Sequence, residues 1–140
     1  MKKLFGIILI CAGLATGNNV YARQNPMLQP ERVLFVADAK QALSKERVGA
    51  MIVQAANRFN WTVIGNDPGK ITLKYDKGNG KHMVKISVDY DDKGFQIKYV
   101  DSFNMNYESN DGNPEIHPNY NRWIANLSKE ISNLQFAVQP

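Results

Sequence analysis

Residues 71–99 read ITLKYDKGNGKHMVKISVDYDDKGFQIKY, and this stretch decides the fold. Apolar and polar side chains alternate in three runs that begin at Ile71, Val84 and Phe95. Alternation with a period of two is typical of strands that have one buried face. Polar, glycine-rich residues separate the runs, as expected for hairpin connections. The stretch therefore predicts three antiparallel strands.

A fourth strand is expected just before this stretch. It opens with Trp61 and Val63 and stops at the sequence NDPG, residues 66–69. Proline followed by glycine is typical of a type II turn, in which the glycine adopts a positive φ. We therefore expect Gly69 to lie in a hairpin that joins the first two strands.

Two amphipathic helices flank the strands. Residues 44–59 and 118–134 carry apolar side chains at the spacing of one helix face. Ser44 is a good N-cap for the first helix, and Asn60 is expected to end it. The second helix is expected to present Tyr120, Trp123, Ile124, Leu127, Ile131 and Leu134 to the core.

The element order α-β-β-β-β-α predicts an α+β two-layer sandwich, with a four-stranded antiparallel sheet and both helices on one face. Val33–Val36 (VLFV) is a further short apolar run, either an edge strand of the sheet or a clip across the core. We expect residues 1–22 to be a signal peptide, residues 23–32 a flexible tail, and residues 33–140 a single domain.

The first 22 residues have the three parts of a secretory signal peptide. Lys2 and Lys3 form a positive n-region, and residues 4–15 form an apolar core. Val20 and Ala22 stand at the −3 and −1 positions of a cleavage site. We expect a periplasmic or secreted protein that is cleaved after Ala22.

A lipoprotein leader is the alternative, because Cys11 lies in the apolar core. Ile10 precedes it, however, where lipidation needs a small residue. Cleavage after residue 22 removes this cysteine, so we expect neither thiol chemistry nor a disulfide in the mature chain.

The charge of the mature chain is small. The full chain carries a formal net charge of +4, and removal of Lys2 and Lys3 lowers it to +2. Nucleic-acid binding usually goes with a clustered basic face, so we expect no nucleic-acid partner. No apolar run reaches the roughly 20 residues of a membrane span, so we expect no transmembrane segment in the mature chain.

Three segments carry a resemblance to a known family: IKYVDS at 97–102, MNY at 105–107 and IHPNYNRWI at 116–124. They are similar to the C-terminal signature of small exported bacterial proteins of uncharacterised function, many of which are regarded as lipoproteins. The resemblance extends from about Ser44 to Ile131, and it implies export without implying an activity. This chain departs from the lipoprotein members because it has no lipobox.

The residues give little basis for catalysis or metal binding. Asp101, Ser102 and His117 are the residue types of a nucleophilic triad, but no nucleophile-elbow glycines surround Ser102. His82 and His117 are the two histidines of the chain, and a zinc site needs clustered ligands. We therefore expect a non-enzymatic protein with no metal and no cofactor.

The candidate site lies where the last strand meets the last helix. Pairing Tyr90 with Phe95 and continuing that register puts Asp101 opposite Val84, on the core side of the sheet. An unpaired carboxylate is costly there, and a helix N-terminus nearby would stabilise it. We expect a hydrogen-bonded cluster that either locks the strand to the helix or, with Tyr120, lines a ligand pocket. Its members are Asp101, Ser102, His117 and Asn121.

The outer sheet face offers a second candidate surface. Lys74, Lys85 and Lys98 fall on this face and form a basic row that suits an anionic partner. The alternative is an ordinary solvated face, on which Asp76 and Asp89 offset the charge.

These observations predict an exported, non-enzymatic binding or accessory protein of the bacterial cell envelope. Its partner is expected to be a protein or a small ligand of the envelope. The alternative is a secreted interaction protein, such as an inhibitor or a host-directed factor, that uses the open sheet face.

Overall fold

The computed structural model describes residues 23–37 and 42–137 of the chain. The predicted signal peptide and its cleavage site lie outside these residues. The helices are α1 (Lys45–Arg58) and α2 (Asn119–Leu134). The strands are β1 (Asn25–Pro26), β2 (Val33–Leu34), β3 (Thr62–Asp67), β4 (Lys70–Lys77), β5 (His82–Tyr90), β6 (Gly94–Phe103), β7 (Glu108–Asn110) and β8 (Asn113–Ile116).

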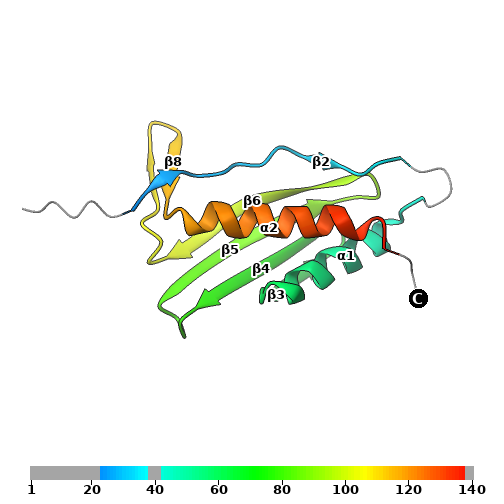
Figure 1. Cartoon of the computed structure of the whole chain (residues 1–140), viewed down its shortest axis with the longest axis horizontal. Helices are drawn as coiled ribbons and strands as arrows, with labels where there is room; N and C mark the ends of the chain where they lie inside the picture. The colour runs from blue at the N-terminus through cyan, green and yellow to red at the C-terminus, as the bar shows by residue number, and fades with distance from the viewer. Residues whose placement is uncertain (1–22, 38–41, 138–140) are drawn as a thin grey trace, which may run out of the picture.

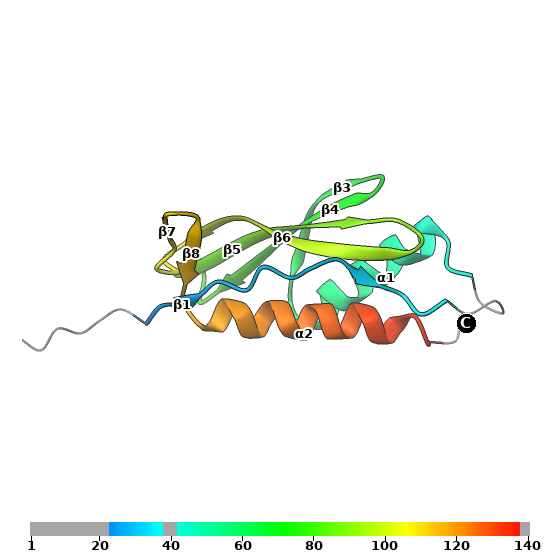
Figure 2. The ribbon, with the colours of Figure 1, turned by 90° about the horizontal axis from the view of Figure 1, so that it is seen from above.

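The strands form two antiparallel sheets. The larger has the order β2-β6-β5-β4-β3, and the smaller has the order β1-β8-β7. Both helices lie on the same side of the larger sheet, as Figure 2 shows. The prediction of an α+β fold is confirmed, whereas the prediction of one four-stranded sheet is wrong. Val33–Leu34 adds a fifth strand at the edge, and residues 108–116 form a hairpin with a sheet of its own.

The local signals for α1 and for the first hairpin are confirmed. The Ser44 side chain accepts a hydrogen bond from the N–H of Arg47, as an N-cap does. Asn60 follows the helix with φ 61°, and Gly69 has φ 85° in the turn between β3 and β4. Left-handed backbone favours asparagine and glycine, which explains why these residue types end the two elements.

The core fills the space between the larger sheet and the helices. Leu127 and Ile131 of α2 are fully buried, as are Val84 and Ile86 of β5, which agrees with the predicted apolar faces. The other fully buried side chains include Tyr120, Phe95, Ile52, Ile71, Leu73, Ile116, Ile124 and Val48. Among the described residues, no helix has the length and apolar character needed to cross a membrane.

The N-terminal segment, defined here as residues 25–36, runs extended along the domain beside β6 and α2 (Figures 1 and 2). The sequence predicts a flexible tail for most of it, yet it is hydrogen-bonded at both ends and in the middle. Its first residues pair with β8, and Val33 pairs with Phe95 of β6. Between these pairings, the Gln96 side chain donates a hydrogen bond to the carbonyl of Pro30 (3.2 Å).

The pairing of β5 with β6 determines where the predicted site residues of β6 lie. The predicted pairs Tyr90–Phe95, Val88–Ile97 and Ile86–Tyr99 are all present. The register then shifts, because β6 contains one extra residue between Tyr99 and Asp101. Such a β-bulge reverses the face to which the following side chains point.

Candidate functional site

The bulge moves Asp101 away from the core. Asp101 pairs with Lys85 rather than with Val84, and its side chain is exposed on the open face. Its carboxylate accepts a hydrogen bond from the N–H of Ser102 (2.8 Å). The predicted position opposite Val84 is therefore wrong, and Ser102 takes that position instead.

Ser102 joins a group of tyrosines rather than the predicted cluster. Its hydroxyl is hydrogen-bonded to the Tyr99 hydroxyl at 2.8 Å. The Tyr99 ring meets the buried Tyr120 edge-on, with ring centroids 6.0 Å apart. On its other side it stacks on Tyr107, with centroids 4.5 Å apart and ring planes at 18°. The structure thus brings Ser102 and Tyr120 close together through Tyr99.

His117 contacts the start of α2. Its Nδ1 accepts a hydrogen bond from the N–H of Asn119 (3.2 Å), so Nδ1 carries no proton in this arrangement. The backbone N–H of His117 donates a hydrogen bond to the carbonyl of Met105 (2.7 Å). Partial burial lowers the pKa of His117, and the positive side chains and His82 nearby lower it further. Neutral His117 therefore connects the helix start to the loop after β6.

Asn121 holds the N-terminal segment. Its side-chain oxygen accepts a hydrogen bond from the N–H of Leu28 (2.7 Å), and its side-chain amide donates to the carbonyl of Pro26 (2.9 Å). Among the described residues, no hydrogen bond links Asp101 to His117 or Asn121. The four residues of the predicted cluster thus fall into three separate groups: Asp101 with Ser102, His117, and Asn121.

The loop between β6 and β7, residues 104–107, contains strained backbone. Asn104 has φ 54° and Asn106 has φ 51°, in the left-handed region. Between them Met105 is buried, which anchors the loop. His82 Nδ1 contacts the carbonyl of Asn104 (2.9 Å), and the Gln24 side chain donates to the carbonyl of Asn106 (2.9 Å). Strain that surrounding contacts hold in place is frequent at binding sites.

Two open hollows meet at the stacked pair of Tyr99 and Tyr107. The first, of about 590 Å³, is lined by residues of β6 and of the 104–107 loop. The second, of about 570 Å³, lies between β6, the N-terminal segment and the β7–β8 hairpin. We call this region the tyrosine groove: the stacked pair with the two hollows beside it.

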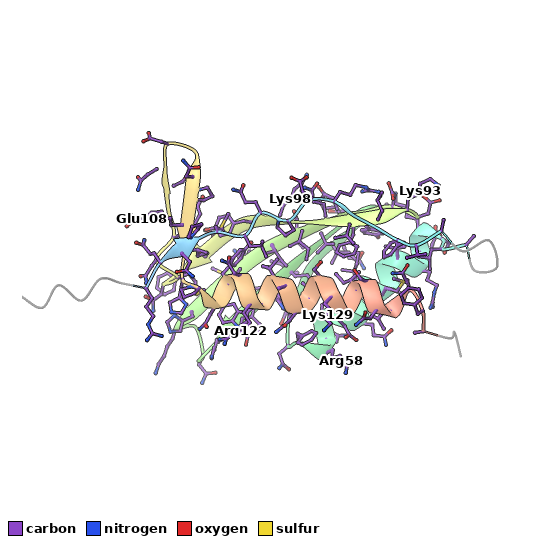
Figure 3. All side chains as sticks on the ribbon, turned by 45° about the horizontal axis from the view of Figure 1, so that its top comes forward. Arg58, Lys93, Lys98, Glu108, Arg122 and Lys129 are labelled. Carbon is purple, nitrogen blue, oxygen red and sulfur yellow. The ribbon has the colours of Figure 1, made fainter. Side chains whose placement is uncertain are left out.

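The tyrosine groove lies at one end of the domain. In Figure 3, Glu108 at the start of the β7–β8 hairpin lies at one end, Lys93 lies at the opposite end, and Lys98 lies between them. Tyr107 is 40% exposed, so its ring is accessible to a ligand. Burial raises the pKa values of both Tyr99 and Tyr120, so both phenols stay protonated at neutral pH. They offer hydroxyl groups rather than a phenolate base.

The lysines of the outer face do not form a simple basic row. Lys98 is paired with Asp89, with Nζ and Oδ2 2.8 Å apart. Lys74 lies directly opposite Lys85 across the β4–β5 pairing, and Lys85 lies opposite Asp101 across the β5–β6 pairing. The face therefore mixes both charges. In the described part of the chain, no group of three or more metal-ligating side chains gathers.

Sequence reasoning missed Tyr99 and Tyr107 as site residues. The alternating pattern placed Tyr99 on the core face of its strand. Tyr107, which stacks on Tyr99, lies beyond the bulge. The asparagines at 104 and 106 were an available signal, because asparagine is enriched in left-handed backbone. Asp111-Gly112 was another, because this dipeptide favours the tight turn of a hairpin. Asp111 has φ 52° and Gly112 has φ 77°.

Comparison of the chain with protein-family models, with curated proteins and with solved structures finds no match.

Proposed function

We propose that this chain is an exported, non-enzymatic binding protein of the bacterial cell envelope and that the tyrosine groove is its binding surface. Export rests on the charged, apolar and small-residue parts of residues 1–22. The resemblance of residues 97–124 to small exported bacterial proteins agrees with it.

The observation that carries the binding role is the stacked pair of Tyr99 and Tyr107 between two hollows. An exposed tyrosine offers a large apolar surface with little side-chain entropy to lose on binding, and it carries a polar tip. Exposed Val100 borders the same groove, at 50% accessibility. A ligand bound here would contact apolar rings and backbone polar groups together.

A pull-down from an envelope extract tests this proposal. The wild-type protein, Tyr107→Ala and Phe136→Ala serve as baits. Phe136 is 66% exposed and lies just after α2, away from the groove residues, so it controls for nonspecific aromatic binding. We expect the wild type and Phe136→Ala to retain the same species and Tyr107→Ala to lose them. Equal retention by all three baits would contradict a role for the groove.

The open face of the larger sheet supports a second candidate, a secreted interaction protein. Neither helix covers this face (Figure 2). Lys74 lies directly opposite Lys85 there, which is an unfavourable pairing of like charges, and Asp101 on the other side of Lys85 offsets part of this charge. Lys74→Gln with Lys85→Gln would abolish partner capture under this alternative and leave it unchanged if the tyrosine groove is the surface.

A further inference from the structure

Three aromatic side chains from different parts of the chain form a row beside the end of α1. The Tyr75 ring of β4 lies between two indole rings, with its centroid 5.3 Å from that of Trp61 and 4.6 Å from that of Trp123 on α2. The ring planes are tilted by 46° and 49°. Together with residues at the end of α1, the three rings line a hollow of about 170 Å³. We call it the tryptophan hollow.

The C-terminal turn of α1 fixes one wall of the tryptophan hollow. The N–H of Trp61 donates a hydrogen bond to the carbonyl of Ala56 (2.9 Å), and the N–H of Asn60 donates to the carbonyl of Asn57 (3.3 Å). With Asn60 in left-handed backbone, these two bonds form the Schellman motif that commonly ends a helix. The positions of Asn60 and Trp61 at the hollow are therefore set by the helix itself.

The polar atoms of the three rings have no partner in the part of the chain that the structure describes. No hydrogen bond there engages the indole N–H of Trp61 or Trp123, or the hydroxyl of Tyr75. Yet no buried side-chain nitrogen or oxygen of the described residues lacks a partner. All three polar atoms are therefore open to solvent, although Trp61 as a whole is only 3% exposed. Tryptophan N–H and tyrosine O–H groups usually find a partner, and here it must come from outside the fold.

The charge at the tryptophan hollow favours a neutral ligand. Its one cationic lining residue is Arg58, labelled in Figure 3. The guanidinium is already paired with Glu130 of α2, with Nη1 and Oε1 2.9 Å apart. No carboxylate lines the hollow, so a cationic ligand would meet hydrogen-bond donors and no counter-ion. The remaining polar lining residues are Asn60 and Asn126, both exposed, whose side-chain amides both donate and accept.

We propose that the tryptophan hollow binds a single neutral sugar residue of a glycan. A pyranose ring has apolar C–H faces that pack on aromatic rings, and its hydroxyl oxygens accept hydrogen bonds from N–H and O–H donors. A purely apolar ligand would instead leave the two indole N–H groups and the Tyr75 hydroxyl unpaired, which is costly. Ligand sites usually combine an apolar lining with a few placed polar groups, as this hollow does.

The tryptophan hollow is separate from the tyrosine groove. It shares no lining residue with the two hollows of the groove, and its volume is less than a third of either. The small volume suits one sugar ring rather than an extended chain. This inference therefore goes beyond the proposed function, and either of the two can fail while the other holds.

A fluorescence titration of the purified protein tests this inference. Trp61 and Trp123 are the two tryptophans of the chain, so indole emission reports on this hollow alone. The probes are methyl β-glucoside, methyl N-acetyl-β-glucosaminide and the linear polyol mannitol, which has hydroxyl groups but no ring. We expect a saturable change with at least one glycoside, half complete on the order of 1–10 mM, and none with mannitol. An equal response to mannitol, or no saturation by either glycoside up to about 100 mM, overturns the inference.

Matched substitutions locate the bound sugar. Tyr75→Phe removes only the hydroxyl at the hollow, and Tyr107→Phe makes the same change in the tyrosine groove. Asn126→Ala removes an exposed amide at the hollow, and Asn133→Ala removes one elsewhere on α2. We expect the two hollow variants to bind about fivefold more weakly, as the loss of one net hydrogen bond implies, and the two controls to bind like the wild type. Unchanged half-saturation in both hollow variants would place the sugar elsewhere and overturn the inference. The envelope pull-down with Tyr107→Ala decides the proposed function separately from this result.

Discussion

Asn121 binds Leu28 across 93 residues of sequence, and the same side chain also binds the carbonyl of Pro26. One amide thus satisfies a donor and an acceptor of the N-terminal segment. Asn121 contacts only main-chain groups of the segment. The two hydrogen bonds therefore need the Asn121 side chain and no particular side chain at Pro26 or Leu28.

Asn121→Ala removes both hydrogen bonds. We expect it to lower the free energy of unfolding by about 1–2 kcal/mol, since each net hydrogen bond is worth roughly 1 kcal/mol. Urea unfolding measures this, and hydrogen exchange should become faster at Leu28. Asn133→Ala, at an exposed position of the same helix, serves as the control and should change stability by less than about 0.5 kcal/mol. Equal effects of the two substitutions would contradict the contact.

Leu127→Ala creates a cavity between α2 and the larger sheet. Leu127 is fully buried. We expect a loss of about 2–5 kcal/mol, the range for deleting a buried leucine side chain. Lys129→Ala on the exposed face of α2 is the control. A loss below about 0.5 kcal/mol for Leu127→Ala would show that α2 is not packed against the sheet as described.

His117 makes stability depend on pH. Its pKa in the folded protein lies below the ordinary value of 6.5, chiefly because burial disfavours the charged form. The unfolded chain therefore binds more protons in the window just below pH 6.5, and stability falls as the pH drops through the folded pKa. Protonation of Nδ1 also removes the hydrogen bond from Asn119.

Urea midpoints between pH 8 and pH 5, about the range in which histidine titrates, measure this effect. We expect the wild type to lose more stability toward pH 5 than His117→Gln, which cannot titrate. The comparison uses the slope of the urea midpoint against pH, so it holds even if the substitution removes the hydrogen bond to Asn119. Parallel curves for the two proteins would rule out His117 as the titrating group.

Asp101→Asn tests the position of Asp101 on the open face. The amide oxygen of asparagine can still accept the N–H of Ser102, and the site is exposed. We expect the free energy of unfolding to change by less than about 0.5 kcal/mol. A loss of about 2 kcal/mol or more would restore the original expectation of a buried carboxylate that locks strand to helix.

Cleavage after Ala22 is expected to place Arg23 at the N-terminus of the exported protein. Intact-mass spectrometry of the protein from the periplasm or the medium measures this directly. A protein that retains Met1, or a lipid on Cys11, would contradict it.

Local patterns predicted the parts of the fold that local forces determine. Ser44, Asn60 and Gly69 mark element ends, because their side chains or φ preferences act within a few residues. Alternation gave the register between Tyr90 and Ile86 of β5 and the first half of β6 correctly.

The rest depends on contacts that no local pattern encodes. The β6 bulge at Val100 uses no glycine, so nothing in the sequence marks it, and one extra residue was enough to place Asp101 on the wrong face. The N-terminal segment looks unstructured because its partners, Gln96 and Asn121, lie far along the chain. The tyrosine groove could not be predicted for the same two reasons, because the bulge and the N-terminal segment form its walls.

We expect the placement of β1 against β8 to make this pairing form late in folding. Strands β3 to β6 connect neighbours in sequence, so they can assemble early and locally. Asn25, in contrast, must wait for Ile116. Contacts between distant residues carry a loop-closure cost that rises slowly with the length of the intervening chain, and they tend to form late. We therefore expect the N-terminal segment of the domain to reach its native place late, and until then the side of β6 that faces away from β5 has no neighbouring strand.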